Sequence, residues 1–150
     1  MKGRYIMTVK IKLLTESAKM PTAGSDGAAG RDLYADIKRK TAIRPGGIKL
    51  IPTGVSMEIP EGCFGAVYPR SGLAVKNGLR LANCTGIIDC DYRGEIIVAL
   101  HNDSEETQTI TKGMRIAQII IQRYEDVDFE VVEDLNWSER GFNGFGSTGD

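Results

Sequence analysis

Apolar and polar side chains alternate along much of this chain, and this period of two limits the fold more than any other feature of the sequence. In one such segment Val9, Ile11 and Leu13 alternate with Lys10 and Lys12. Alternation is typical of a half-buried β-strand, because successive side chains of a strand point to opposite faces. The pattern recurs in Leu33, Ala35 and Ile37 and again in Val55, Met57 and Ile59.

Turn sequences rich in glycine, proline, asparagine and aspartate separate these segments, as expected for tight reversals of the chain. The runs 95–100 and 116–122 are apolar enough to be central strands, and 129–132 predicts a last strand. Many short strands with turns between them predict an all-β fold, which could be a sandwich, a jelly roll or a barrel. The turns are expected at 44–47, 59–62, 101–104 and 111–113.

A single segment, 71–78 (SGLAVKNG), has the composition of a helix. Ser71 is a candidate N-cap, since a hydroxyl can accept a hydrogen bond from the first free N–H groups of a helix. Gly78 is a candidate C-terminal stop, because glycine adopts the left-handed conformation that ends many helices. The sequence therefore predicts one helix of two turns at most.

The length of 150 residues fits one domain, with a β body over about 1–132 and a C-terminal arm over about 133–150. The net charge of -1 shows that the chain does not have the excess of basic residues that is typical of a nucleic-acid-binding protein. No apolar run reaches membrane-spanning length, and the N-terminal residues do not have the pattern of a signal peptide. We therefore expect a cytoplasmic protein that binds neither nucleic acid nor a membrane.

The cysteines and the histidine exclude several kinds of site. Cys63, Cys84 and Cys90 are odd in number and lack CxxC spacing, which favours reduced thiols over a disulfide framework or a zinc site. The single histidine, His101, excludes a multi-histidine metal site within one chain. It is also the one candidate for a Ser-His-Asp triad, although a surface or strand-end histidine is the favoured interpretation.

Two polar segments in the middle of the chain have residues suited to chemistry. Arg70, Ser71 and Gly72 would place a guanidinium, a hydroxyl and free N–H groups at a helix start, which is an anion site unless the tripeptide is an ordinary cap. The second segment, GIIDCDYRG, predicts one arm of a hairpin with Asp89 near its turn and the chain from residue 95 as the returning arm. Asp89 could accept a proton from water and Tyr92 could present a flat ring, but turn chemistry explains this aspartate equally well.

The chain ends with RGFNGFGSTGD, residues 140–150, which contains four glycines. Glycine content and position at a chain end favour fraying. The arginine, hydroxyl and backbone N–H groups of this segment favour a functional role in binding phosphates. Both descriptions hold if the tail is mobile in an empty site and ordered when a triphosphate binds.

Together with 27–34 (GAAGRDLY) and 113–118 (GMRIAQ), these three segments resemble the five motifs of the homotrimeric dUTPases, the deoxyuridine triphosphate nucleotidohydrolases. The resemblance runs from about Gly27 to Gly149, and PRSGLA, GIIDCDYRGE, RIAQ and GFGSTG are its most specific parts. It implies a distorted β jelly roll and a trimer with active sites shared between subunits. The implied reaction is dUTP plus water giving dUMP and pyrophosphate, with Mg²⁺ on the triphosphate. This reaction would keep dUTP low and supply dUMP for thymidylate synthesis.

The resemblance assigns the base and sugar end of the site to the hairpin. Asp89 matches the aspartate that orients and deprotonates the water attacking the α-phosphorus. Tyr92 matches the tyrosine whose ring lies under the deoxyribose and leaves no space for a 2′-hydroxyl, which would reject UTP. Uracil would be recognised mainly by backbone groups. The residues that match this uracil-binding part are Asn83, Gly86, Ile87, Ile88 and Ile97.

The phosphate end is implied by three other motifs. Arg70, Ser71, Gly72 and Gln118 match residues that hold the phosphates, and Asp32 matches an acidic residue near the water shell of the metal ion. Mg²⁺ keeps most of its waters and favours phosphate oxygens. The resemblance therefore implies no direct protein ligand to the ion.

The glycine-rich tail matches a mobile fifth motif that closes over the bound nucleotide and excludes water other than the nucleophile. Arg140 would bind the γ-phosphate and Phe145 would stack on uracil. The sequence departs from the family pattern at Arg31, commonly aromatic or aliphatic, and at Asn143, usually glycine. The residues that would close around the phosphates are Gly146, Ser147 and Thr148.

Two alternatives stay open. The related dCTP deaminases have the same fold and an arginine-serine motif, but a deaminase gives no reason for the GFGSTG tail and would need a glutamate placed at the base. A dUTPase-like protein that acts by binding a regulator is the other alternative. Because every catalytic position of the family has its match here, loss of catalysis is not expected, although an added binding role stays possible.

Overall fold

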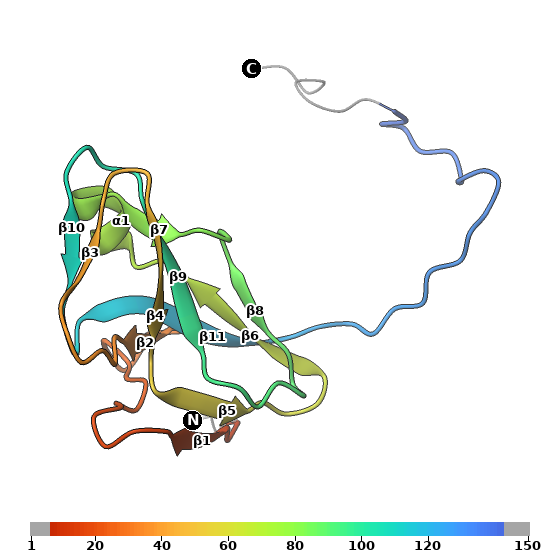
Figure 1. Ribbon diagram of the computed structural model, residues 1–150. Coiled ribbons are helices and arrows are strands. Elements are labelled where there is room, and N and C mark those ends of the chain that lie inside the picture. Colours follow the sequence, from red (N-terminus) through yellow and green to blue (C-terminus); the bar gives the residue numbers. More distant parts are fainter. Residues whose placement is uncertain (1–6, 143–150) are drawn as a thin grey trace.

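The computed structural model describes residues 7–142, and over that range it contains eleven β-strands and one short helix (Figure 1). All strand pairs are antiparallel. Residues 1–6 and 143–150 lie outside the description. The predicted all-β class with one short helix is confirmed. At seven residues, the single helix within 7–142 is far too short to cross a membrane.

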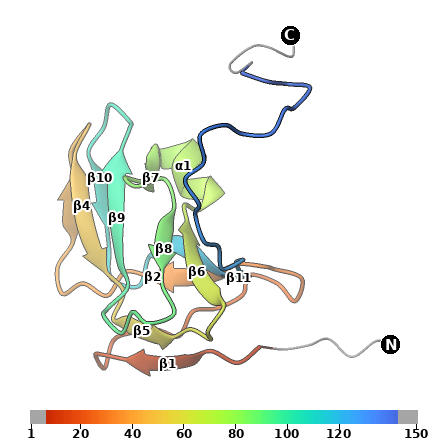
Figure 2. The ribbon, with the colours of Figure 1, turned by 90° about the vertical axis from the view of Figure 1, so that its right-hand side faces the viewer.

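Two larger sheets form separate layers of the body (Figure 2). The four-stranded sheet has the order β2-β11-β6-β8, and the three-stranded sheet has the order β4-β9-β7. Two strand pairs, β1-β5 and β10-β3, complete the body at its ends. The bounds are β1 Lys10–Leu13, β2 Arg31–Tyr34, β3 Thr41–Ile43, β4 Ile48–Pro52, β5 Val55–Glu58, β6 Cys63–Tyr68, β7 Leu79–Leu81, β8 Gly86–Ile88, β9 Ile97–Asn102, β10 Gln108–Ile110 and β11 Arg115–Arg123.

The core lies between these layers and is built from branched aliphatic side chains. Val55, Met57 and Ile59 are all buried, as their alternation predicts. Leu33 and Leu100 have no exposed surface at all. Burial of one such side chain contributes about 1.5–3 kcal/mol, so the sheets are held mainly by this core.

The helix differs from its prediction at one end. It spans α1 Ser71–Asn77, and its N-cap is Arg70 rather than Ser71, with an extended backbone and no side-chain cap hydrogen bond. Gly78 ends the helix as predicted, in the left-handed region at φ 63°, and its N–H donates to the carbonyl of Ala74. Because Ser71 is the first helical residue instead of the cap, its hydroxyl is not used to cap the helix.

The predicted hairpin also differs, because its two arms belong to different sheets. β8 pairs with β6, whereas β9 pairs with β4 and β7. The sequence pattern cannot show which neighbour a strand chooses, since the buried side chains of both arms satisfy either pairing. The consequence is an open space between the arms rather than a hydrogen-bonded ladder.

The strand predicted at Phe129–Val132 is wrong. The last strand of the described chain ends at Arg123, and residues 124–142 run away from the sheets without strand structure (Figures 1 and 2). Phe129 and Val131 are 95% and 99% exposed. A strand needs a neighbour for its N–H and C=O groups, and this segment passes clear of the sheet edges of its own chain.

Candidate active site

The space between the hairpin arms is a cavity of about 280 Å³, referred to below as the hairpin cavity. It collects every residue that the resemblance assigns to the base and sugar end within the hairpin and beside it. Val67, Leu81 and Val98, which sequence reasoning missed, line its apolar interior. The predicted residues that line it are Asn83, Gly86, Ile87, Ile88, Asp89, Tyr92 and Ile97.

The edge of β8 gives this cavity its polar character. β8 is the outermost strand of its sheet, so one side of its backbone is paired with β6 and the other is not part of a ladder. A strand edge presents alternating N–H and C=O groups. A Cβ on Gly86 would lie 3.2 Å from the Cβ of Val67, so glycine keeps the backbone close to β6 here. Ile87 and Ile97 are exposed apolar side chains at the cavity.

A tight turn places the carboxylate and the aromatic ring at the mouth of the cavity. The N–H of Tyr92 donates to the carbonyl of Asp89 at 3.2 Å, which closes the turn. The hydroxyl of Tyr92 donates to the carbonyl of Glu95 at 2.9 Å, and this bond fixes the ring. Asp89 is exposed, and its carboxylate makes no hydrogen bond or ion pair with the residues described. The turn therefore leaves this carboxylate available to a water or ligand.

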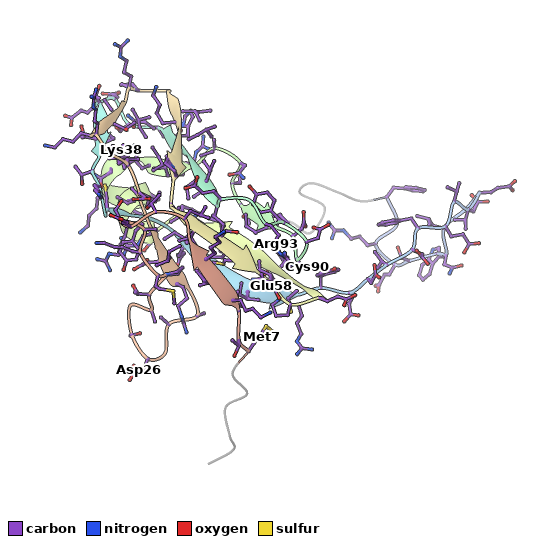
Figure 3. All side chains as sticks on the ribbon, turned by 60° about the horizontal axis from the view of Figure 1, so that its bottom comes forward. Met7, Asp26, Lys38, Glu58, Cys90 and Arg93 are labelled. Carbon is purple, nitrogen blue, oxygen red and sulfur yellow. The ribbon has the colours of Figure 1, made fainter. Side chains whose placement is uncertain are left out.

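Charged groups surround the base of the turn. Arg93 donates to the carbonyls of Cys90 and Tyr92, and Figure 3 shows Arg93 near Glu58 on β5. The pKa of Glu58 is lowered, first by its hydrogen bond from Lys10 and then by the charges of that lysine and of Arg93. Arg93 thus acts in the structure of the turn and lines no part of the hairpin cavity.

A second cavity of about 380 Å³, referred to below as the charged cavity, lies at the start of α1 and beside the first half of β11. The buried carboxylate of Asp32 holds Arg70 through its Nε at 2.8 Å and Arg115 through its Nη1 at 3.2 Å. Arg70 is thereby fixed with its Nη groups left for other contacts. The predicted residues that line this cavity are Asp32, Arg70, Ser71, Gly72 and Gln118.

Gln118 is positioned by glycine and by backbone. Its Nε2 donates to the carbonyl of Pro69 at 3.1 Å. A Cβ on Gly30 would lie 2.5 Å from the Oε1 of Gln118, so only glycine leaves room for this carboxamide. Arg115, on the neighbouring part of β11, forms an ion pair with Asp32.

Replacement of Gly30 by alanine is expected to push the Gln118 carboxamide away from its observed position. The obstructing atom is the end of a flexible side chain, so the fold should keep its melting temperature. The resemblance implies that Gln118 holds a phosphate, and loss of one hydrogen bond to a charged phosphate should then raise the KM for a nucleotide by about tenfold. Steady-state kinetics of Gly30→Ala beside thermal unfolding would check both results. An unchanged KM would remove Gln118 from the phosphate contacts.

The two cavities have no lining residue in common, and they do not contain every predicted residue. Arg140 lies on the exposed arm and lines neither cavity. His101 also lines neither, and its Nδ1 lies 2.9 Å from Asp103 Oδ1 at the end of β9, in agreement with a strand-end histidine. Predicted residues Phe145, Gly146, Ser147 and Thr148 fall outside the described part of the chain.

The two cavities define the class of protein. One is an apolar cleft with a carboxylate at its mouth, and the other is lined by guanidinium, hydroxyl and amide groups. This is a small jelly-roll protein suited to a ligand with a flat ring and an anionic tail. A family model of dUTPases matches residues 16–149. The chain belongs to the dUTPase family.

Relatives and solved structures agree with this assignment. Deoxyuridine 5′-triphosphate nucleotidohydrolase of Clostridium tetani is 47% identical over 142 residues, covering 95% of this chain and 97% of the relative. The enzyme of the same name from Yarrowia lipolytica is 49% identical over 145 residues, covering 95% and 90%. The dUTPase of Staphylococcus bacteriophage 80alpha, solved with dUPNHPP, has a TM-score of 0.83 at 30% identity and covers 95% of this chain and 99% of its own.

Proposed function

We propose that this chain hydrolyses dUTP to dUMP and pyrophosphate by attack of water on the α-phosphorus. The observation that carries the proposal is the hairpin cavity, in which an unpaired strand edge, an aromatic ring and an available carboxylate meet. Membership of the dUTPase family and the names of the relatives support the substrate. In the cytoplasm this reaction would keep dUTP low and supply dUMP for thymidylate synthesis.

Uracil is the base that a strand edge can select. Its edge alternates acceptor, donor and acceptor, and the backbone edge of β8 alternates donor and acceptor groups in the same way. The amino group of cytosine would face a donor, which costs the free energy of an unsatisfied polar group. Asn83 at the cavity adds a side-chain amide, and the apolar walls bury the ring faces.

Asp89 is proposed as the general base. Its carboxylate would orient the attacking water and take its proton as the bond to the α-phosphorus forms and the bond to the leaving pyrophosphate breaks. Tyr92, with its hydroxyl held by Glu95, would lie against the deoxyribose. A ring fixed in this way leaves no space for a 2′-hydroxyl and would reject UTP by steric exclusion.

The charged cavity is proposed to hold the phosphates through Arg70, Ser71, Gly72 and Gln118. Its donor set fits a metal ion carried on phosphate oxygens, because its carboxylate, Asp32, is already engaged by two arginines and could reach only the ion's waters. Within residues 7–142 no group of three or more His, Cys, Asp or Glu side chains could hold an ion. Mg²⁺ bound to the triphosphate would fix its geometry and offset developing charge.

Three copies of the chain are proposed to complete each site. The hairpin cavity and the charged cavity are separate in one chain, although a nucleotide needs both its base and its phosphates bound. The arm exposes apolar side chains that a single chain does not cover, among them Phe129 and Val131. A homotrimer would bring the two cavities together from different subunits and bury these side chains. The tail from Arg140 would then close over the nucleotide.

A panel of nucleotides tests the proposed function. The protein is incubated with Mg²⁺ and dUTP, dCTP, dTTP or UTP, and both pyrophosphate and ammonia are measured. Pyrophosphate from dUTP alone is the expected result. Ammonia from dCTP would support the deaminase instead, and the absence of any turnover would contradict both enzymes.

A further inference from the structure

The chain that returns from the Tyr92 turn, residues 93–96, is hydrogen-bonded to the turn between β4 and β5 and to the first two residues of β5. We call residues 93–96 the return segment. Four hydrogen bonds join the two parts, although they are far apart in the sequence. The bonds are Thr53 Oγ1 to the carbonyl of Ile96 at 2.6 Å, the Gly54 N–H to Glu95 Oε1 at 2.7 Å, Ser56 Oγ to the carbonyl of Arg93 at 2.7 Å, and the Ile96 N–H to the carbonyl of Val55 at 2.8 Å.

The two hydroxyls in this set are buried, which is unusual for side chains next to an apolar core. Thr53 is 1% exposed and Ser56 is 7% exposed. A buried hydroxyl without a partner is costly, so each strongly favours the position in which its carbonyl acceptor is held. The return segment is therefore held in place by Thr53 and Ser56, without the help of any ligand.

The ring of Tyr92 rests on this fixed segment. Its hydroxyl donates to the carbonyl of Glu95 at 2.9 Å. The ring also lies directly over Gly94, where an added Cβ would be 2.3 Å from the tyrosine oxygen and 2.5 Å from Cζ. No side chain fits at Gly94 while the ring keeps its place. The height of the ring above the backbone is thus set by the return segment.

We propose that Gly94 and Thr53 are positioning residues for sugar discrimination. Gly94 leaves the room in which the ring of Tyr92 lies against the return segment, and Thr53 holds that segment in place. Both residues therefore determine the position from which the ring excludes a 2′-hydroxyl. The inference rests on the proposed function, because it assumes a nucleotide sugar against Tyr92. It adds two residues that contact neither the base nor the phosphates in the arrangement proposed above.

The test compares dUTP with UTP for Gly94→Ala and Thr53→Val, both as kcat/KM with Mg²⁺ and as Kd by calorimetry without it. Gly94→Ala should push the hydroxyl end of the ring off the carbonyl of Glu95, and Thr53→Val should release the segment that carries this carbonyl. In both variants the ring leaves the place from which it excludes a 2′-hydroxyl, so each should lose about tenfold or more of the preference for dUTP, the discrimination that one small steric group provides. Thr53→Ser keeps the hydroxyl and should keep the preference. Thr109→Val, an exposed threonine on β10, should match the unchanged chain.

The readout is the ratio between two nucleotides, which a merely structural role would leave unchanged while lowering both values together. If Gly94→Ala does not fold, Tyr92→Phe removes the bond to Glu95 without adding volume and should lower the same ratio. If the wild-type chain prefers dUTP and the variants keep that preference, the inference is overturned while the proposed function stands. An unchanged chain that neither binds nor hydrolyses dUTP would overturn the proposed function first.

Discussion

Replacement of Asp89 by asparagine is expected to lower the turnover of dUTP by about 100- to 10,000-fold, the usual contribution of a positioned general base. Asparagine has nearly the same size but cannot accept the proton of the attacking water. Binding should persist, because the strand edge of β8 and the charged cavity are unchanged. The measurement is kcat with saturating dUTP beside the Kd of the same nucleotide.

Asp91 supplies the matched control for this prediction. It is an exposed aspartate in the same turn, but it does not line the hairpin cavity. Asp91→Asn should therefore turn dUTP over at the rate of the unchanged chain. Near-normal turnover by Asp89→Asn, or an equal loss in both variants, would remove Asp89 as the base.

Truncation after Ser138 is expected to leave the body folded and to reduce turnover by about 100-fold or more, a loss of the size seen when one positioned contact to transition-state charge is removed. Residues 124–142 form no strand in the described chain, so removing 139–150 takes away no core contact of the sheets. The proposed lid, including Arg140, would be lost. Thermal unfolding and kcat together check the two halves of this expectation.

A mixture of two inactive chains tests whether sites are shared between subunits. The truncated chain and the Asp89→Asn chain are refolded separately and then together. If the tail and Asp89 of one site come from different subunits, the mixed protein should regain part of the activity. Full activity of the truncated chain alone would contradict the lid, and no recovery in the mixture would contradict shared sites.

Much of the fold could be predicted from the sequence because local alternation and turn chemistry are recorded in neighbouring residues. The alternation at Val55, Met57 and Ile59 located a strand and its buried face. Strand pairing could not be predicted in this way. Whether β8 joins β6 or β9 depends on the packing of whole layers. The strand expected at Phe129–Val132 failed for a related reason, since its own chain offers it no neighbour.

The residues of the candidate site could be predicted where they form compact sequence motifs. The structure groups these residues into two cavities. Arg70, Ser71 and Gly72 are adjacent in sequence and in the charged cavity. The support beneath the hairpin was not predictable. Thr53 reaches a carbonyl at residue 96, and its sequence neighbours carry no sign of that contact. Buried hydroxyls that hold a distant backbone are visible only once the fold is known.

Hydrolysis of dUTP in water enriched in oxygen-18 tests the central claim most directly. Water that attacks the α-phosphorus leaves its oxygen on that phosphorus, so mass spectrometry should find one heavy oxygen in dUMP and none in pyrophosphate. Heavy oxygen in pyrophosphate or inorganic phosphate, or the absence of dUMP, would contradict the proposed reaction.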